Sequence, residues 1–347
     1  MDTVTQALLG ATVGQAFFGR ALGPRALAWG AVGGLLPDLD IAASAVDPMG
    51  EWLYHRGPTH ALWFGPVVGP VLGLAAAATV ERRRPSSSAP EADRRRSWIG
   101  LFVLALFTHP LLDVFTTYGT QLLAPFSNRR FAYDAIGIID PAYSILLILA
   151  LVIGLRAGPA SRAARAAALG ALVLSSAYVG YCRYLNLEAE RVARENQPPA
   201  LSASAELHAY PTLFQPWLRR IVAREDTQIC VGWLSLWSSP SPQWSCFTGA
   251  GAKTLEAART TREVRIFEWF AMGETAARVM AGAGGSQVVE IDDIRYGFPD
   301  TPGEGLWGVR VEIDPMGVVN GPVRRYERAL PLPAGRLMAQ LLHLAFG

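Results

Sequence analysis

The sequence predicts an α-helical membrane bundle of about five transmembrane or re-entrant helices, followed by a small, mainly antiparallel β domain of the α+β class. Hydrophobic residues make up 51% of the chain, and its mean hydropathy is positive. The apolar runs lie before about residue 186, and beyond about residue 211 the pattern changes to the period of two that is typical of strands. We therefore expect a membrane-embedded helical domain (1–187), a linker (188–205) and a β-rich domain (206–347).

The first two apolar segments differ in length and in how they end. Thr3–Phe18 is rich in Gly and Ala and is short for a span, so we expect it to be re-entrant or buried against its neighbours. Arg25–Val46 is interrupted by Pro37, because proline removes an amide donor and ends or kinks a helix. Two carboxylates, Asp38 and Asp40, follow this proline at once.

The remaining spans are separated by polar stretches. Glu81–Ser97 is a hydrophilic loop that includes the low-complexity run PSSSAP, which we expect to be mobile. The Asp140-Pro141 pair has the residue types of an N-cap and a first helical position. The expected spans are Ala61–Val80, Trp98–Tyr118, a span from Asp140-Pro141 to Leu155, and Ala166–Leu185.

The distribution of arginines predicts a multi-pass protein of the inner (plasma) membrane with a defined orientation. The loop Glu81–Ser97 carries six arginines in two triplets, which places it in the cytoplasm by the positive-inside rule. Alternation of the spans then places Glu51–His60, the end of the helix that carries His109 and Asp113, and the C-terminal domain outside. The polar residues of three separate segments thereby fall on one face of the membrane.

In the C-terminal part, short alternating runs between Gly, Pro and Ser turns predict strands. The expected strands are Ile229–Trp237, Val264–Phe270, Val288–Ile294 and Leu306–Ile313, and Leu330–Phe346 is expected to form a short closing helix. Cys230 and Cys246 would lie in an oxidising compartment, where a disulfide is possible. Two buried thiols are an equally good interpretation of this pair.

A histidine and an aspartate lie one turn apart on the apolar segment Leu101–Gly119. His109 and Asp113 have the i, i+4 spacing that places two side chains on one helix face. Such groups are costly to bury without a partner, and a metal or a proton relay is the usual reason for them at membrane depth. The other segments supply more donors of the same types, and the six candidate metal ligands are Asp38, Asp40, His55, His60, His109 and Asp113.

Mixed imidazole and carboxylate ligands suit a divalent metal, zinc first and manganese or iron as alternatives, with one or two ions. Arg56 and Asp40 are the candidate catalytic residues, and a guanidinium at Arg56 can bind a phosphate in a bidentate way. Each group also has a simpler interpretation. Asp38 and Asp40 can cap a helix, His55 and His60 can be surface residues, and His109 and Asp113 can form a hydrogen-bonded pair within the bundle. Because three separate segments place these residues at the same predicted depth, a metal site is favoured over these simpler interpretations.

The motifs GGLLPDLD, HRGPTH and THPLLDVFTTYGTQLLAPFS, with a following IIDP, resemble the membrane-bound metal-dependent hydrolase family. Its members are described as LexA-binding, inner-membrane-associated hydrolases, and the resemblance covers roughly residues 1–156. That family is distantly similar to zinc-dependent phospholipases C and P1-type nucleases, which implies a helical metal site and phosphoester hydrolysis. The implied ligands are Asp38, His55, His60, His109 and Asp113. Many relatives have a histidine where this chain has Gln6, so one metal position is either lost or was never essential.

The leading hypothesis is an integral-membrane metal-dependent hydrolase that cleaves a phosphoester with a metal-bound hydroxide at the outer membrane surface. The expected partners are membrane lipid and a small-molecule or lipid-linked phosphoester, and the net charge of +2 argues against nucleic acid. The alternative is a non-enzymatic scaffold with a structural metal or polar site and a partner-binding outer domain. A coupled transporter ranks last, because Ala61–Val80 and Ala142–Leu155 lack the ionisable residues that a pathway needs.

Overall fold

The computed structural model describes residues 1–81, 90–329 and 331–347, which form two compact units. The helical unit contains Met1–Ala43 and Tyr54–Arg183, and the sheet unit contains Ser44–Leu53 and Tyr184–Gly347. Most of the PSSSAP run, which we expected to be mobile, lies outside the described residues. The segment Ser44–Leu53 belongs to the sheet unit, whereas the expected division at residue 187 placed it in the helical domain.

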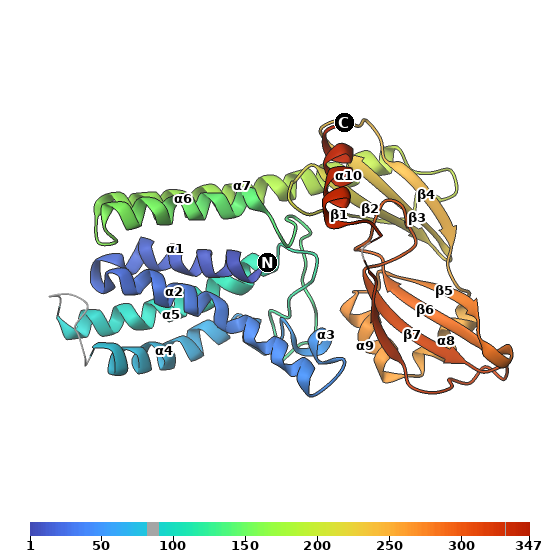
Figure 1. The fold of residues 1–347 in the computed structure, drawn as a ribbon, viewed down its shortest axis with the longest axis horizontal. Helices are drawn as coiled ribbons and strands as arrows, with labels where there is room; N and C mark the ends of the chain where they lie inside the picture. The colour runs from blue at the N-terminus through green and yellow to red at the C-terminus, as the bar shows by residue number, and fades with distance from the viewer. Residues whose placement is uncertain (82–89, 330) are drawn as a thin grey trace. The chain divides into compact units, whose positions relative to one another are not determined.

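The helical unit consists mainly of long helices, and Figure 1 shows α1 (Thr3–Leu22), α2 (Pro24–Leu35), α4 (Phe64–Ala76) and α5 (Glu91–Asp113) side by side. The other elements of the unit are η1 (Leu36–Ala45), η2 (Pro58–His60), η3 (Ala77–Glu81), α6 (Pro141–Ala157) and α7 (Arg162–Glu195). Two of them, η1 and α7, begin in the helical unit and end in the sheet unit.

Close backbone contact between α1 and α2 depends on glycine. A Cβ atom on Gly10 would lie 2.1 Å from the carbonyl oxygen of Gly30, and one on Gly34 would lie 2.3 Å from that of Gln6. Small residues at four-residue spacing allow helices to approach in this way within membranes. The crossing fixes the end of α2, which carries the backbone carbonyl of Gly34 and leads into η1.

Three described helical segments are long and apolar enough to cross a membrane: Pro24–Ala45, Phe64–Glu81 and Arg162–Glu195. Helix α6 is apolar but shorter. Its residues Ile145, Leu149 and Ile153 recur every four residues and are each about half exposed. A continuous exposed apolar face of this kind is typical of contact with lipid. These features support the membrane bundle, while the expected number of about five spans remains a prediction.

The sheet unit contains two four-stranded antiparallel sheets with the strand orders β1-β2-β3-β4 and β5-β6-β7-β8. The first sheet comprises β1 (Glu206–Pro211), β2 (Leu218–Glu225), β3 (Gln228–Ser235) and β4 (Gln243–Thr248). The second comprises β5 (Thr275–Ala281), β6 (Gln287–Asp293), β7 (Trp307–Ile313) and β8 (Arg324–Glu327). The helical elements are α3 (Gly50–Tyr54), which ends in the helical unit, α8 (Ala252–Arg259), α9 (Arg262–Phe270), η4 (Ala283–Gly285) and α10 (Ala334–Phe346).

Two expectations for this half of the chain need correction. The predicted strand Val264–Phe270 is wrong, because these residues form most of α9. The side chain of Thr261 caps this helix by accepting from the amide of Val264, and Val264, Phe267 and Phe270 are buried at a spacing of three. In addition, α7 continues to Glu195, so the first part of the expected linker is helical.

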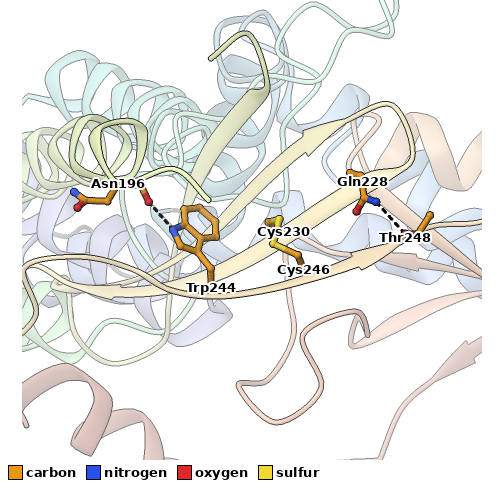
Figure 2. Close-up of a disulfide and its surroundings, with 6 residues drawn as sticks. All are labelled: Asn196, Gln228, Cys230, Trp244, Cys246 and Thr248. Carbon is orange, nitrogen blue, oxygen red and sulfur yellow. Dashed lines mark hydrogen bonds between the residues drawn. A yellow bond between two sulfur atoms is a disulfide. The ribbon is translucent and has the colours of Figure 1, made fainter. Parts of the chain in front are cut away.

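Cys230 and Cys246 form a disulfide, which is one of the two arrangements that the sequence allows. Cys230 on β3 and Cys246 on β4 are direct partners in the antiparallel register, as Figure 2 shows. Near them, the indole of Trp244 donates to the carbonyl of Asn196 at the end of α7. The closing helix is confirmed as α10, although it begins later than expected.

Candidate metal centre

Four of the six predicted ligands come together within the helical unit. Asp38 follows Pro37 on η1, His60 ends η2, and His109 and Asp113 lie one turn apart on α5. Each offers one ligand atom, and these atoms lie within 4.8 Å of one another. The side chains of His60, His109 and Asp113 are fully buried, whereas that of Asp38 is 15% exposed. The group is therefore reached from the side of Asp38.

The tautomer of His109 follows from its backbone partner. Its Nδ1 lies 2.6 Å from the carbonyl oxygen of Gly34. A carbonyl oxygen only accepts hydrogen bonds, so we assign the ring hydrogen to Nδ1. The Nε2 atom of His109 then presents a lone pair to the group.

The same reasoning applies to His60 through a neighbouring hydroxyl. Thr59 Oγ1 donates its single hydrogen to Asp40 Oδ2 at 2.5 Å. The hydroxyl oxygen can then only accept from His60 Nδ1, which lies 3.1 Å away, and Asp40 Oδ2 is 3.2 Å from the same nitrogen. A carboxylate that fixes a histidine in this way is typical of metal sites, and it leaves His60 Nε2 as a second lone pair.

When both imidazoles are neutral, these two nitrogens and the two carboxylate oxygens are all acceptors and converge without a hydrogen-bond donor between them. The two Nε2 atoms are 3.0 Å apart. Asp38 Oδ1 lies 3.4 Å and 3.3 Å from them, and Asp113 Oδ2 lies 3.3 Å and 3.4 Å from them. For a tetrahedral ion with ligand bonds of about 2.0–2.1 Å, neighbouring donor atoms lie about 3.3 Å apart. The observed spacing therefore fits a single small divalent cation.

The carboxylates around His60 favour a positive charge among the four ligand atoms. Burial lowers the pKa of His60, but hydrogen bonds with Asp113, Asp38 and Asp40 outweigh it and raise the pKa to about 10. A proton and a metal ion thus compete for the same ligand atoms, and the affinity for the metal should fall as the pH falls.

Arg56 contacts the carboxylate of Asp113 and helps to fix its position. Its Nε lies 3.2 Å from Asp113 Oδ2, and its Nη1 donates to the hydroxyl of Thr116 at 2.6 Å. The guanidinium is buried and lies 4.9 Å from the centre of the Tyr118 ring. Its backbone has φ +60°, which is uncommon for a residue with a side chain. The structure thus gives Arg56 a positioning contact, and its predicted contact with a phosphate remains a prediction.

Asp40 and His55 do not belong to the group of four. Asp40 accepts from His55 Nδ1 at 2.6 Å and from the amide of Arg56 at 3.1 Å, in addition to its contact with His60. The ring of His55 stands edge-on to those of His60 and Tyr118. Both residues therefore support His60 from outside rather than sharing its ligand position.

Sequence reasoning missed several residues that support the centre. The amide of Gln6 donates to Asp113 Oδ1 at 3.0 Å and to the carbonyl of His109 at 3.2 Å, and the Met1 amino group bonds the same carboxylate oxygen. Gln6 thus orients a candidate ligand. Thr59 could have been found from its place beside His60, whereas the role of the Gly34 carbonyl leaves no signal in the sequence.

Comparison with known proteins gives one match. A family model described as YdjM inner membrane protein matches residues 1–189, which include all six predicted ligands. No curated protein matches the chain, and no solved structure matches it.

Proposed function

The chain belongs to the YdjM inner membrane protein family, and we propose that it is an integral-membrane hydrolase that uses a divalent metal ion to cleave a phosphoester. The observation that carries this proposal is the convergence of two imidazole nitrogens and two carboxylate oxygens, in which each nitrogen lies 3.0–3.4 Å from the other nitrogen and from both oxygens. A divalent ion bound there would lower the pKa of a water molecule and polarise a phosphoryl oxygen.

The residues around the ligands have separable roles in this proposal. Asp38, His60, His109 and Asp113 hold one ion, with zinc as the first choice for nitrogen and oxygen donors at this spacing. Asp40 and Gly34 keep the two imidazoles in the right tautomer. Arg56 keeps the carboxylate of Asp113 oriented and offsets its charge. The partial exposure of Asp38 marks the side from which substrate would arrive.

We further propose that the centre faces the outer surface of the membrane and that the substrate is a lipid or lipid-linked headgroup. Asp38 lies about two thirds of the way along the candidate span Pro24–Ala45, and His60 lies just before the span Phe64–Glu81. In this proposal, both lie toward the headgroup region on one side of the bilayer. The Cys230–Cys246 disulfide supports an extracytoplasmic sheet unit, since disulfides persist in oxidising compartments.

One observation favours a second function, a scaffold with a structural metal. Four protein donors are enough to fill the tetrahedral coordination of zinc, whereas catalytic zinc keeps one position open for water. In that case the ion would fix the loop segments to α5, and the sheet unit would bind a partner.

Metal content and hydrolysis, measured on the same detergent-purified protein, test both functions. We expect about one metal ion per chain and hydrolysis of bis(4-nitrophenyl) phosphate, both lost in His109→Gln and Asp113→Asn and both kept in His208→Gln. The control histidine lies on β1 and is half exposed. Bound metal without hydrolysis, together with the intense visible absorption of a four-coordinate Co²⁺ form, would support the scaffold. Protein that binds no divalent metal would refute both functions.

A further inference from the structure

The segment between the two ligand-bearing loops is part of the sheet unit. Residues Ser44–Leu53 belong to that unit, although Asp38 and Asp40 precede them and His55 and His60 follow them within the helical unit. We call Ser44–Leu53 the anchor segment. Its two ends are continuous with the residues that hold or orient the candidate metal.

Trp52 fastens the anchor segment to the sheet unit. Its side chain is 1% exposed, and its ring centre lies 4.7 Å from that of Phe267 and 5.6 Å from that of Phe270 on α9. The guanidinium of Arg325 lies 4.5 Å from the ring centre. A buried tryptophan of this kind contributes a large apolar contact area, on the order of 150–250 Å², and a cation–π contact adds to it.

Two ion pairs hold the residues of the anchor segment that precede the tryptophan. Arg325 lies 2.7 Å from Glu51, and Arg262 at the start of α9 lies 2.8 Å from Asp47. Met49 between them is 2% exposed. The anchor segment is thus fixed by an apolar core and two charged contacts, all within the sheet unit.

We propose that Trp52 is a positioning residue for the metal centre: the sheet unit holds the anchor segment, and this keeps Asp40, His55 and His60 ready to accept the ion. Release of the segment would join the flanking residues into one long free loop, whose ordering would then oppose metal binding. Because coupling between two sites is reciprocal, metal binding should also stabilise the packing of Trp52 on α9. This inference rests on the proposed metal centre.

The test compares Zn²⁺ affinity in the full chain purified in detergent. Trp52→Ala should lower the affinity by about tenfold or more, as is usual when partners of metal ligands are lost, with one site per chain retained. Trp52→Phe should restore most of the affinity. The matched control is Trp237→Ala, which removes a 65% exposed tryptophan that packs on Trp217 and Phe346 and should leave affinity unchanged.

Two further measurements separate positioning from general damage. Zn²⁺ should slow amide hydrogen exchange in α9 of the wild-type chain but not of Trp52→Ala, which a residue that only stabilises the fold would not produce. If Trp52→Ala fails to fold, Glu51→Arg should weaken Zn²⁺ binding and Glu51→Arg/Arg325→Glu should restore it. A wild-type chain that binds Zn²⁺, with equal affinity in the folded Trp52 or Glu51 variants, would overturn this inference and leave the metal centre standing. A wild-type chain without Zn²⁺ binding would overturn both.

Discussion

Replacement of Thr59 by valine tests whether the Thr59 hydroxyl orients His60 and Asp40 for the metal. The substitution keeps the shape of the side chain but removes the hydroxyl that donates to Asp40 Oδ2 at 2.5 Å and lies 3.1 Å from His60 Nδ1. Asp40 then loses one donor, and His60 Nδ1 keeps only the carboxylate at 3.2 Å. The ligand atoms themselves are unchanged, so any loss of metal affinity comes from their orientation.

A hydrogen bond to a charged group is worth about 1.5–3 kcal/mol. If most of that free energy is lost from the metal-bound form, Zn²⁺ affinity falls by about ten- to a hundredfold, since each 1.4 kcal/mol is a factor of about ten. The assay is competition with a chromogenic chelator at fixed pH, with Thr79→Val as the control. The Thr79 hydroxyl on η3 donates to the backbone carbonyls of Ala75 and Ala76 on α4. Equal Zn²⁺ affinity in Thr59→Val and the wild type would refute the role of the Thr59 hydroxyl in orienting His60 and Asp40.

Two further predictions concern the packing that supports the centre and the sheet unit. Gly34→Ala would place a Cβ atom 2.3 Å from the carbonyl oxygen of Gln6, so we expect about 1–3 kcal/mol of destabilisation and weaker Zn²⁺ binding through His109. Thermal unfolding and chelator competition measure the two effects, and a stable Gly34→Ala chain would contradict the close crossing. Burial raises the pKa of Glu274, so its folded state favours the proton and loses stability as the pH rises. Glu274→Gln should therefore raise the melting temperature at pH 8 and less so at pH 5, and an equal gain at both would contradict this.

The sequence predicted the ligand group better than the support around it. His109 and Asp113 follow from helical spacing, and Asp38 and His60 follow from residue type and depth. Asp40 could not be separated from Asp38, because both carboxylates follow Pro37 in a polar turn. On η1, with about three residues per turn, residues two apart point in different directions, so Asp38 faces the donors and Asp40 faces the far side of His60.

The errors in the fold have comparable physical causes. VRIFEWF contains apolar residues at spacings of both two and three, and over so short a run the two periods cannot be told apart. Tertiary packing of Val264, Phe267 and Phe270 decides for the helix. The anchor segment could not be assigned to the sheet unit, since its partners on α9 and β8 lie far along the chain and no local pattern links them.

The order of synthesis gives the discontinuous sheet unit an unusual history. Trp52 is made long before Phe267 and Arg325, and at about 5–20 residues per second the interval is roughly ten to fifty-five seconds. During that time the indole has no aromatic neighbours from α9 to cover it. The anchor segment therefore lacks its aromatic packing until α9 and β8 have been synthesised, and under our proposal the metal centre would mature only after that.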